Sequence, residues 1–233
     1  EISSTKGFTG HTTSASGSIE TVISILAMQN DFTPANLRWT KGSEGGIVPT
    51  PGNDNIKLDN IICNSFGFGG NDSSLIISRE PQKRGKIDLE ERGVKVSAEE
   101  VITSAEELSQ LREFISPMEG RRMGKLMKAA HLASLRALQK GGIDSPDAII
   151  TATSRGMLET SLQFLDDISA NDEEHLKPTL FMQSTHNTLG SALAIRVKCH
   201  GYNTTYSHGD QSLEWAMRDA ERLIKSGKAD TVL

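Results

Sequence analysis

Alternation between helical segments and short apolar runs dominates the second half of this chain. Residues 121–140 place apolar side chains at the three- and four-residue spacing of a helix, which a glycine pair at 141–142 closes. The same alternation predicts strands at 147–152, 202–207 and 231–233, and helices at 104–114, 157–169, 185–201 and 212–226. This order predicts an α/β layer structure around a buried parallel or mixed sheet.

The first half has a different organisation. Residues 17–29 follow helical spacing, with Ser16 or Ser18 available as a cap, and residues 30–55 form a long connection rich in proline and glycine. Two short apolar runs, 61–63 and 75–77, predict strands joined by a glycine-rich hairpin. After Arg79 the composition becomes charged. We therefore expect a boundary near residue 80, with 80–120 as a partly mobile linker or lateral excursion.

Composition excludes several classes of protein. The 233 residues carry a net charge of -5, which argues against a nucleic-acid partner. No apolar run predicts a membrane span, and no secretion signal is visible at the start of the sequence. The two cysteines, Cys63 and Cys199, cannot form a disulfide framework, so we expect a cytoplasmic location. Since the sequence lacks an initiator methionine, it reads as an excerpt or as two consecutive pieces.

Two glycine-rich motifs carry the candidate chemistry. Residues 3–11 read SSTKGFTGH and precede the helix at 17–29, whereas residues 64–70 read NSFGFGG between the two predicted strands. Glycines let a backbone approach a ligand closely and leave its N–H groups free. His11 lies just before a helix N-terminus, whose positive dipole end disfavours protonation. A neutral His11 could donate its Nε2–H to a developing oxyanion.

These motifs, in this order, resemble the closing part of β-ketoacyl-(acyl carrier protein) synthases of the thiolase superfamily. Residues 1–79 resemble the C-terminal end of such a unit. Residues 80–233, above all from Arg121 onward, resemble the N-terminal half of cysteine-lacking ketosynthase-like proteins of aryl-polyene and flexirubin pathways. The resemblance implies a thiolase-like layered α/β fold, with five-stranded mixed sheets and packed helices, represented here in part.

The resemblance also implies roles for particular residues. His11 is expected to be catalytic, and Lys6 to be a buried lysine that orders the active-site groups. Phe66, Phe68 and Gly69 are expected to bind substrate, with the backbone N–H near Phe68 in an oxyanion hole and its ring gating acyl entry.

True ketosynthases of this family carry a nucleophilic cysteine at the turn between a strand and a helix. Counting without gaps places Asp210 at that position, and a slip of one residue would place Gln211 there, as in chain-length factors. No cysteine occurs in this stretch, so the second half cannot form an acyl thioester by the usual route. We expect Asp210 instead to cap the helix that begins near residue 212.

The remaining polar candidates have plainer interpretations. Cys63 is expected to be a small buried hydrophobe. Cys199 and His200 are adjacent on a helix and do not face each other, which excludes a cysteine-hydrolase dyad. His186 and His208 are expected to pack or cap. The pair Arg121 and Arg122, at the start of the predicted helix, solvates a helix end or attracts an acidic carrier protein.

The expected function is decarboxylative Claisen condensation of malonyl and acyl thioesters in fatty acid, polyketide or aryl-polyene biosynthesis. The second half would be a non-condensing partner. We expect no metal and no cofactor beyond the phosphopantetheine of an acyl carrier protein, which would be a partner together with a ketosynthase homo- or heterodimer. The alternative is a non-catalytic chain-length-factor-like or scaffold subunit. A Rossmann-like nucleotide-binding domain is disfavoured because no strand precedes a GxGxxG motif.

Overall fold

The computed structural model describes residues 1–39, 48–68, 70–81 and 92–233. Contacts within the chain divide it into two compact units, one made of residues 1–67 and 72–86 and the other of residues 68–71 and 87–233. The boundary expected near residue 80 stays a prediction, because it leads into residues 82–91, which lie outside the described residues.

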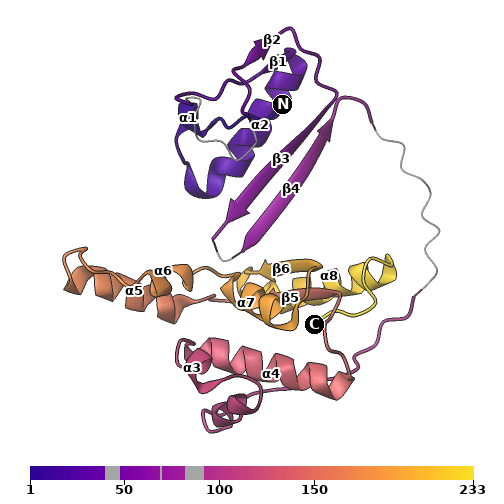
Figure 1. Ribbon diagram of the computed structural model, residues 1–233. Coiled ribbons are helices and arrows are strands. Elements are labelled where there is room, and N and C mark those ends of the chain that lie inside the picture. The colour runs from indigo at the N-terminus through magenta and orange to yellow at the C-terminus, as the bar shows by residue number, and fades with distance from the viewer. Residues whose placement is uncertain (40–47, 69, 82–91) are drawn as a thin grey trace. The chain divides into compact units, whose positions relative to one another are not determined.

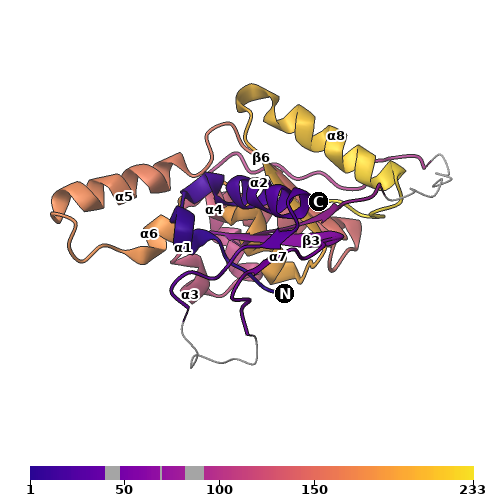
Figure 2. The ribbon, with the colours of Figure 1, turned by 90° about the horizontal axis from the view of Figure 1, so that it is seen from above.

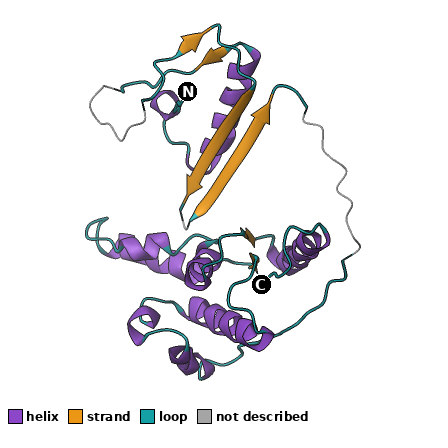
Figure 3. Ribbon diagram, turned by 45° about the vertical axis from the view of Figure 1, so that its right-hand side comes forward, coloured by secondary structure: helices purple, strands orange, loops and turns teal. Residues whose placement is uncertain are grey.

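The first unit consists of one long helix, a short strand pair and a hairpin (Figure 1). Its elements are, in chain order, α1 (Lys6–Thr9), the 3₁₀ turn η1 (Thr13–Ala15), α2 (Ser16–Gln29), β1 (Phe32–Thr33), β2 (Asn53–Asp54), β3 (Asn60–Gly67) and β4 (Asn71–Ser78). Strands β1 and β2 pair antiparallel within the connection predicted at 30–55. Figure 3 shows β3 and β4 running in opposite directions. The predicted helix and hairpin are confirmed.

Helix α2 packs along β3. Burial alternates along the strand: Ile61, Cys63 and Ser65 are half-buried, whereas Ile62 and Phe66 on the other face are exposed. The Cys63 thiol lies 3.1 Å from the Ser24 hydroxyl of α2. Cys63 is therefore a packing residue of the helix–strand contact, as predicted, although it is only partly buried.

The predicted serine cap of α2 is wrong. Ala15 occupies the position before the helix, and no side chain caps the first turn.

Arg79 ties the end of the hairpin to the end of α2. Its guanidinium donates to the Met28 carbonyl in the last turn of the helix, to Asp31 at 2.6 Å and to the Leu58 carbonyl at 3.2 Å. A cation at this place also meets the negative end of the helix dipole. Arg79 thus joins three segments of the first unit, and its side chain is only 27% exposed.

Replacing Arg79 by methionine keeps most of the apolar stem and removes these bonds. We expect the first unit to lose about 1.5–3 kcal/mol of unfolding free energy, the range for hydrogen bonds to a charged group. The matched control is Lys57→Met, which removes an exposed ion pair with Asp59 and is expected to cost less than about 0.5 kcal/mol. Urea titrations followed by Trp39 fluorescence, in a Trp215→Phe background, would contradict this expectation if the two variants unfolded alike.

The second unit is built from helices around a parallel strand pair. Its elements are η2 (Glu107–Glu113, 3₁₀), α3 (Pro117–Gly120), α4 (Lys125–Gly141), β5 (Ala148–Ala152), α5 (Leu158–Ala170), α6 (Pro178–Met182), α7 (Thr188–Val197), β6 (Tyr202–Tyr206), η3 (Gly209–Gln211, 3₁₀) and α8 (Ser212–Lys225). Helices α5 and α6 lie side by side (Figures 1 and 2). Gly142 closes α4 with a left-handed φ of 67°, as the glycine pair predicted.

Strand β5 is buried on both faces. Ala148 packs with Leu223 and Ala229 around α8, whereas Ile149, on the opposite face, packs with Leu193 and Ala194 of α7. Strand β6 pairs parallel along one edge of β5, from Ala148 opposite Tyr202 to Ala152 opposite Tyr206. Along the other edge, Val232 bridges Ala148 in parallel. The predicted α/β layering around a buried parallel sheet is confirmed.

The described strands form two-stranded sheets, and Val232 adds a single isolated bridge to β5. The five-stranded sheets implied by the resemblance are therefore not completed within the described part of this chain.

The segment expected as a linker or lateral excursion, 80–120, is packed over its last part. Leu111 and Ile115 are buried against Leu132 of α4 and form one of the core clusters of the second unit. The predicted helix at 104–114 is the shorter 3₁₀ segment η2. Arg121 and Arg122 do not begin a helix but lie exposed between α3 and α4.

Candidate active site

His11 lies in an unusual loop immediately before α2. Gly10 has a φ of 71°, and Thr13 has a φ of 49°, which is rare for a β-branched residue. This turn directs the Thr13 backbone N–H at Nδ1 of His11, 3.1 Å away, and the Ser16 hydroxyl lies 3.0 Å from the same nitrogen. Backbone strain here is thus used to orient an exposed imidazole at the start of a helix.

These contacts assign the tautomer of His11. A backbone N–H can only donate, so Nδ1 must accept the hydrogen bond from Thr13. In the neutral ring the proton then resides on Nε2. With Nδ1 as the acceptor, His11 presents an Nε2–H donor.

Lys6 is less buried than the resemblance implied. Its side chain is 43% exposed, and its ammonium forms an ion pair with Glu20 of α2, whose side chain is 18% exposed. The predicted burial is wrong within this chain. Glu20 lies on α2, the helix that begins beside His11, and no local sequence pattern marks it as a partner of Lys6.

The start of α2 packs against the second glycine-rich motif. A Cβ on Gly17 would lie 2.6 Å from the Ser65 hydroxyl, so a larger residue here would need that hydroxyl to rotate away. Gly17 follows Ser16, the contact of His11. The described contacts therefore place Ser65 of the second motif against the first turn of the helix that follows His11.

The two phenylalanines of the second motif are exposed. Phe66 is 76% exposed on the face of β3 opposite α2, and Phe68 is 63% exposed in the turn. Gly69 lies outside the described residues. Phe68 is assigned to the second unit, not to the unit that contains His11. Its predicted proximity to His11 therefore stays a prediction.

Asp210 lies where the parallel strand β6 leads into α8. It occupies the 3₁₀ turn η3 and is exposed, and no side chain caps either η3 or α8. The predicted cap is wrong. Ser212, which is buried, connects this turn to the end of β5. Its hydroxyl accepts from the His208 N–H at 2.8 Å and lies 2.9 Å from the Thr153 carbonyl that follows the strand.

His186 and His208 each lie against a neighbouring residue, as expected. The His186 ring lies directly over Gly156, where an added Cβ would fall 1.6 Å from Nδ1. The His208 ring is 5.9 Å from that of Tyr206.

A buried carboxylate that the sequence analysis missed lies between β6 and α8. Asp219 accepts from the Tyr202 hydroxyl at 2.8 Å and from Arg222 at 2.6 Å, and it is also bonded by Tyr206. Burial raises the pKa of Asp219, but these hydrogen bonds outweigh it and hold the pKa below its usual value. Burial, together with the bond to Asp219, raises the pKa of Tyr206 to about 12.

The thiol of the second unit is not a nucleophile at the Asp210 turn. Cys199 is buried in the core with Ile149 and Leu193. Among residues 1–39, 48–68, 70–81 and 92–233, no group of three or more His, Cys, Asp or Glu side chains is placed to hold a metal ion. Nor is any helix of these residues long and apolar enough to cross a membrane.

Residues 95–233 match the family described as the β-ketoacyl synthase N-terminal domain, more than half of the chain. The chain belongs to the β-ketoacyl synthase family. Residues 1–40 match the C-terminal domain of the same family, so along this chain the C-terminal match precedes the N-terminal one.

Curated relatives carry related names. The 3-oxoacyl-[acyl-carrier-protein] synthase 2 of Coxiella burnetii is 41% identical over 81 residues, which cover 34% of this chain and 19% of the relative. The corresponding synthase 1 of Haemophilus influenzae is 37% identical over 81 residues, 34% of this chain and 20% of the relative. Each aligned region thus spans about a fifth of the relative.

Two solved structures are also similar. One is a ketosynthase, ApeO, in complex with its chain length factor, ApeC, from Xenorhabdus doucetiae, at 22% identity and a TM-score of 0.43, covering 54% of this chain and 58% of that one. The other is the ishigamide ketosynthase/chain length factor, at 25% identity and a TM-score of 0.46, covering 51% of this chain and 35% of that one.

Proposed function

We propose that the protein to which this chain belongs carries out β-ketoacyl-(acyl carrier protein) synthase chemistry, with the second unit as a non-condensing partner. The observation that carries the proposal is the fixed tautomer of His11, whose Nδ1 is held by Thr13 and whose Nε2–H is exposed. Family membership and the shared motif support the assignment of this imidazole to the reaction.

The proposed chemistry needs a hydrogen-bond donor where negative charge develops. Loss of CO₂ from a malonyl thioester leaves an enolate, and the Nε2–H of His11 would stabilise charge on the thioester oxygen. The enolate carbon then attacks the carbonyl of an acyl thioester, so that a C–C bond forms, a C–S bond breaks and the thiolate that carried the acyl group leaves. The N–H near Phe68 is proposed as a second donor.

Asp210 cannot replace the missing cysteine. A carboxylate is a weak nucleophile, and its acyl adduct would be a mixed anhydride, more reactive than the thioester from which it formed. The equilibrium therefore opposes loading of Asp210, which supports a non-condensing role for the second unit.

The order of the family matches supports a particular organisation. Since the C-terminal match at 1–40 precedes the N-terminal match at 95–233, we infer that this chain spans the junction of two consecutive ketosynthase-like units, 1–79 and 80–233. The second unit would pair with a ketosynthase as a homo- or heterodimer. An acyl carrier protein would deliver the substrates in the cytoplasm through its phosphopantetheine, without a further cofactor.

A non-catalytic, chain-length-factor-like or scaffold protein is the second candidate. It is favoured by the exposed Asp210 at the position expected for the nucleophile. The two candidates differ in malonyl decarboxylation, which a scaffold does not perform.

Acylation tests the proposed role of the Asp210 turn. After incubation of the full-length protein with an acyl-loaded carrier protein, peptide mass spectrometry is expected to find no acyl group on Asp210. The variant Asp210→Cys is expected to acquire an acyl thioester at this residue. The control Asp144→Cys, at an exposed residue of the same unit, is expected to stay unmodified. An acyl group on Asp210, or equal labelling of the two cysteine variants, would contradict the alignment.

A further inference from the structure

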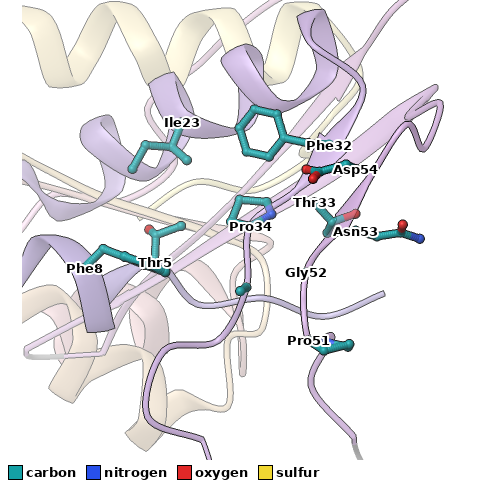
Figure 4. Close-up of a pocket in the computed structure, with 11 residues that line it drawn as sticks. Thr5, Phe8, Ile23, Phe32, Thr33, Pro34, Pro51, Gly52, Asn53 and Asp54 are labelled. Atoms are coloured by element: carbon teal, nitrogen blue, oxygen red, sulfur yellow. The ribbon is translucent and has the colours of Figure 1, made fainter.

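An open pocket of about 530 Å³ lies within the first unit (Figure 4). Its walls come from the turn of α1, from α2, from the segment that starts at β1 and from the segment that ends at β2. Most of its lining is apolar: Phe8, Ile23, Phe32, Pro34, Ala35 and Pro51. The volume falls in the range that holds small organic ligands, about 300–1,000 Å³.

One polar side chain of this cavity has no partner. The hydroxyl oxygen of Thr5 is shielded from solvent and forms no hydrogen bond. Thr5 occupies the position before α1, where a threonine usually turns its hydroxyl onto the first free N–H groups of the helix, yet no such cap is formed. Figure 4 shows the side chain between Phe8 and Pro34, with Ile23 across the cavity. A buried hydroxyl that forgoes its cap points to a missing bonding partner.

The other polar groups of the lining restrict the charge of that partner. The Thr33 hydroxyl already donates to the Glu1 carboxylate at 2.7 Å. Asp54 is the one charged residue among those that line the cavity, and it would repel an anion. An apolar body with a single uncharged polar group matches this lining.

We propose that this cavity binds a neutral, compact, amphipathic small molecule whose polar group hydrogen-bonds the Thr5 hydroxyl while its apolar body packs against Phe8, Phe32 and Pro34. The hydroxyl and methyl of threonine are similar in size, so rotation about Cα–Cβ presents the hydroxyl to the cavity without a backbone shift. Lys6 lies between Thr5 and Phe8 in the same turn, so an occupant would also steady the segment that carries Lys6. The proposal does not depend on condensing activity.

Three matched probes test this proposal on the full-length protein: 2-phenylethanol, ethylbenzene and phenylacetate. Their dissociation constants would be measured by titration with NMR detection of protein methyl groups. We expect saturable binding of 2-phenylethanol, and weaker binding of phenylacetate because of Asp54. Thr5→Val removes the hydroxyl at nearly constant shape. It is expected to raise the dissociation constant of 2-phenylethanol about fivefold, the equivalent of one hydrogen bond, and to leave the dissociation constant of ethylbenzene unchanged.

Two further variants keep the test independent of folding. Thr5→Ser retains the hydroxyl and is expected to bind 2-phenylethanol like the wild type, whereas Ala35→Leu fills the cavity and is expected to abolish binding of all three probes. The proposal is overturned if wild-type protein shows no saturable binding. It is equally overturned if Thr5→Val binds 2-phenylethanol as tightly as Thr5→Ser does.

Discussion

Replacement of His11 by alanine is expected to slow carrier-dependent malonyl decarboxylation by about 10²–10³-fold, the usual cost of losing one preorganised oxyanion donor. The reason is geometric: Thr13 fixes the acceptor role of Nδ1, so the variant loses the single N–H that the ring presents to substrate. The measurement is the release of labelled CO₂ from malonyl-loaded carrier protein by the full-length protein.

The matched control for His11 is His200→Ala. His200 is also exposed but belongs to the second unit, and its loss is expected to leave the rate unchanged. A third variant, His11→Gln, keeps an N–H donor and is expected to retain more activity than His11→Ala. Equal rates for His11→Ala and His200→Ala would remove His11 from the mechanism.

Replacement of Asp219 by alanine is expected to lower the unfolding free energy of the second unit by roughly 2–4 kcal/mol. The carboxylate is 3% exposed, joins α8 to β6 through Tyr202 and pairs with Arg222 on its own helix, so the variant leaves the tyrosine hydroxyl without its acceptor. The control is Glu214→Ala, which removes an exposed ion pair with Arg218 on the same helix and is expected to cost less than about 0.5 kcal/mol. Urea unfolding followed by Trp215 fluorescence, in a Trp39→Phe background, compares the two variants.

The same carboxylate sets an acid limit on stability. The pKa of Asp219 is lowered in the folded state. The contribution of the ionised carboxylate to the unfolding free energy is therefore complete above the unfolded pKa of about 3.9 and is lost as the pH falls through the folded pKa. The stability difference between wild type and Asp219→Asn should therefore shrink below about pH 4. A difference that stayed constant from pH 6 to pH 3 would contradict the assignment.

Elements with strong local periodicity were predictable from the sequence. Helices α2, α4, α5 and α8 and strands β5 and β6 appear within a few residues of their expected bounds, because burial of one side of each element imposes a spacing that the sequence displays. The hairpin was predictable from its glycines. The position of His11 just before a helix followed from the periodicity of the helix after it, whereas its orientation depends on the turn at Gly10 and Thr13.

Features that depend on distant partners were not predictable. The burial of Leu111 and Ile115 requires Leu132 of α4, which no local pattern reveals. Residue type predicted Asp210 as the helix cap. In the structure, Ser212 connects the turn to the end of β5 because its hydroxyl is within hydrogen-bond distance of the Thr153 carbonyl. The burial of Asp219 likewise arises from two tyrosines on a neighbouring strand. Lys6 illustrates a different limit: the resemblance identified the residue but not its exposure.

The most direct test of the proposed function is the rate of CO₂ release from malonyl-loaded acyl carrier protein by the full-length protein. We expect release that saturates with carrier concentration and falls in His11→Ala but not in His200→Ala. Release at the uncatalysed rate, with the carrier protein present and the protein folded, would contradict ketosynthase chemistry and favour the non-catalytic subunit.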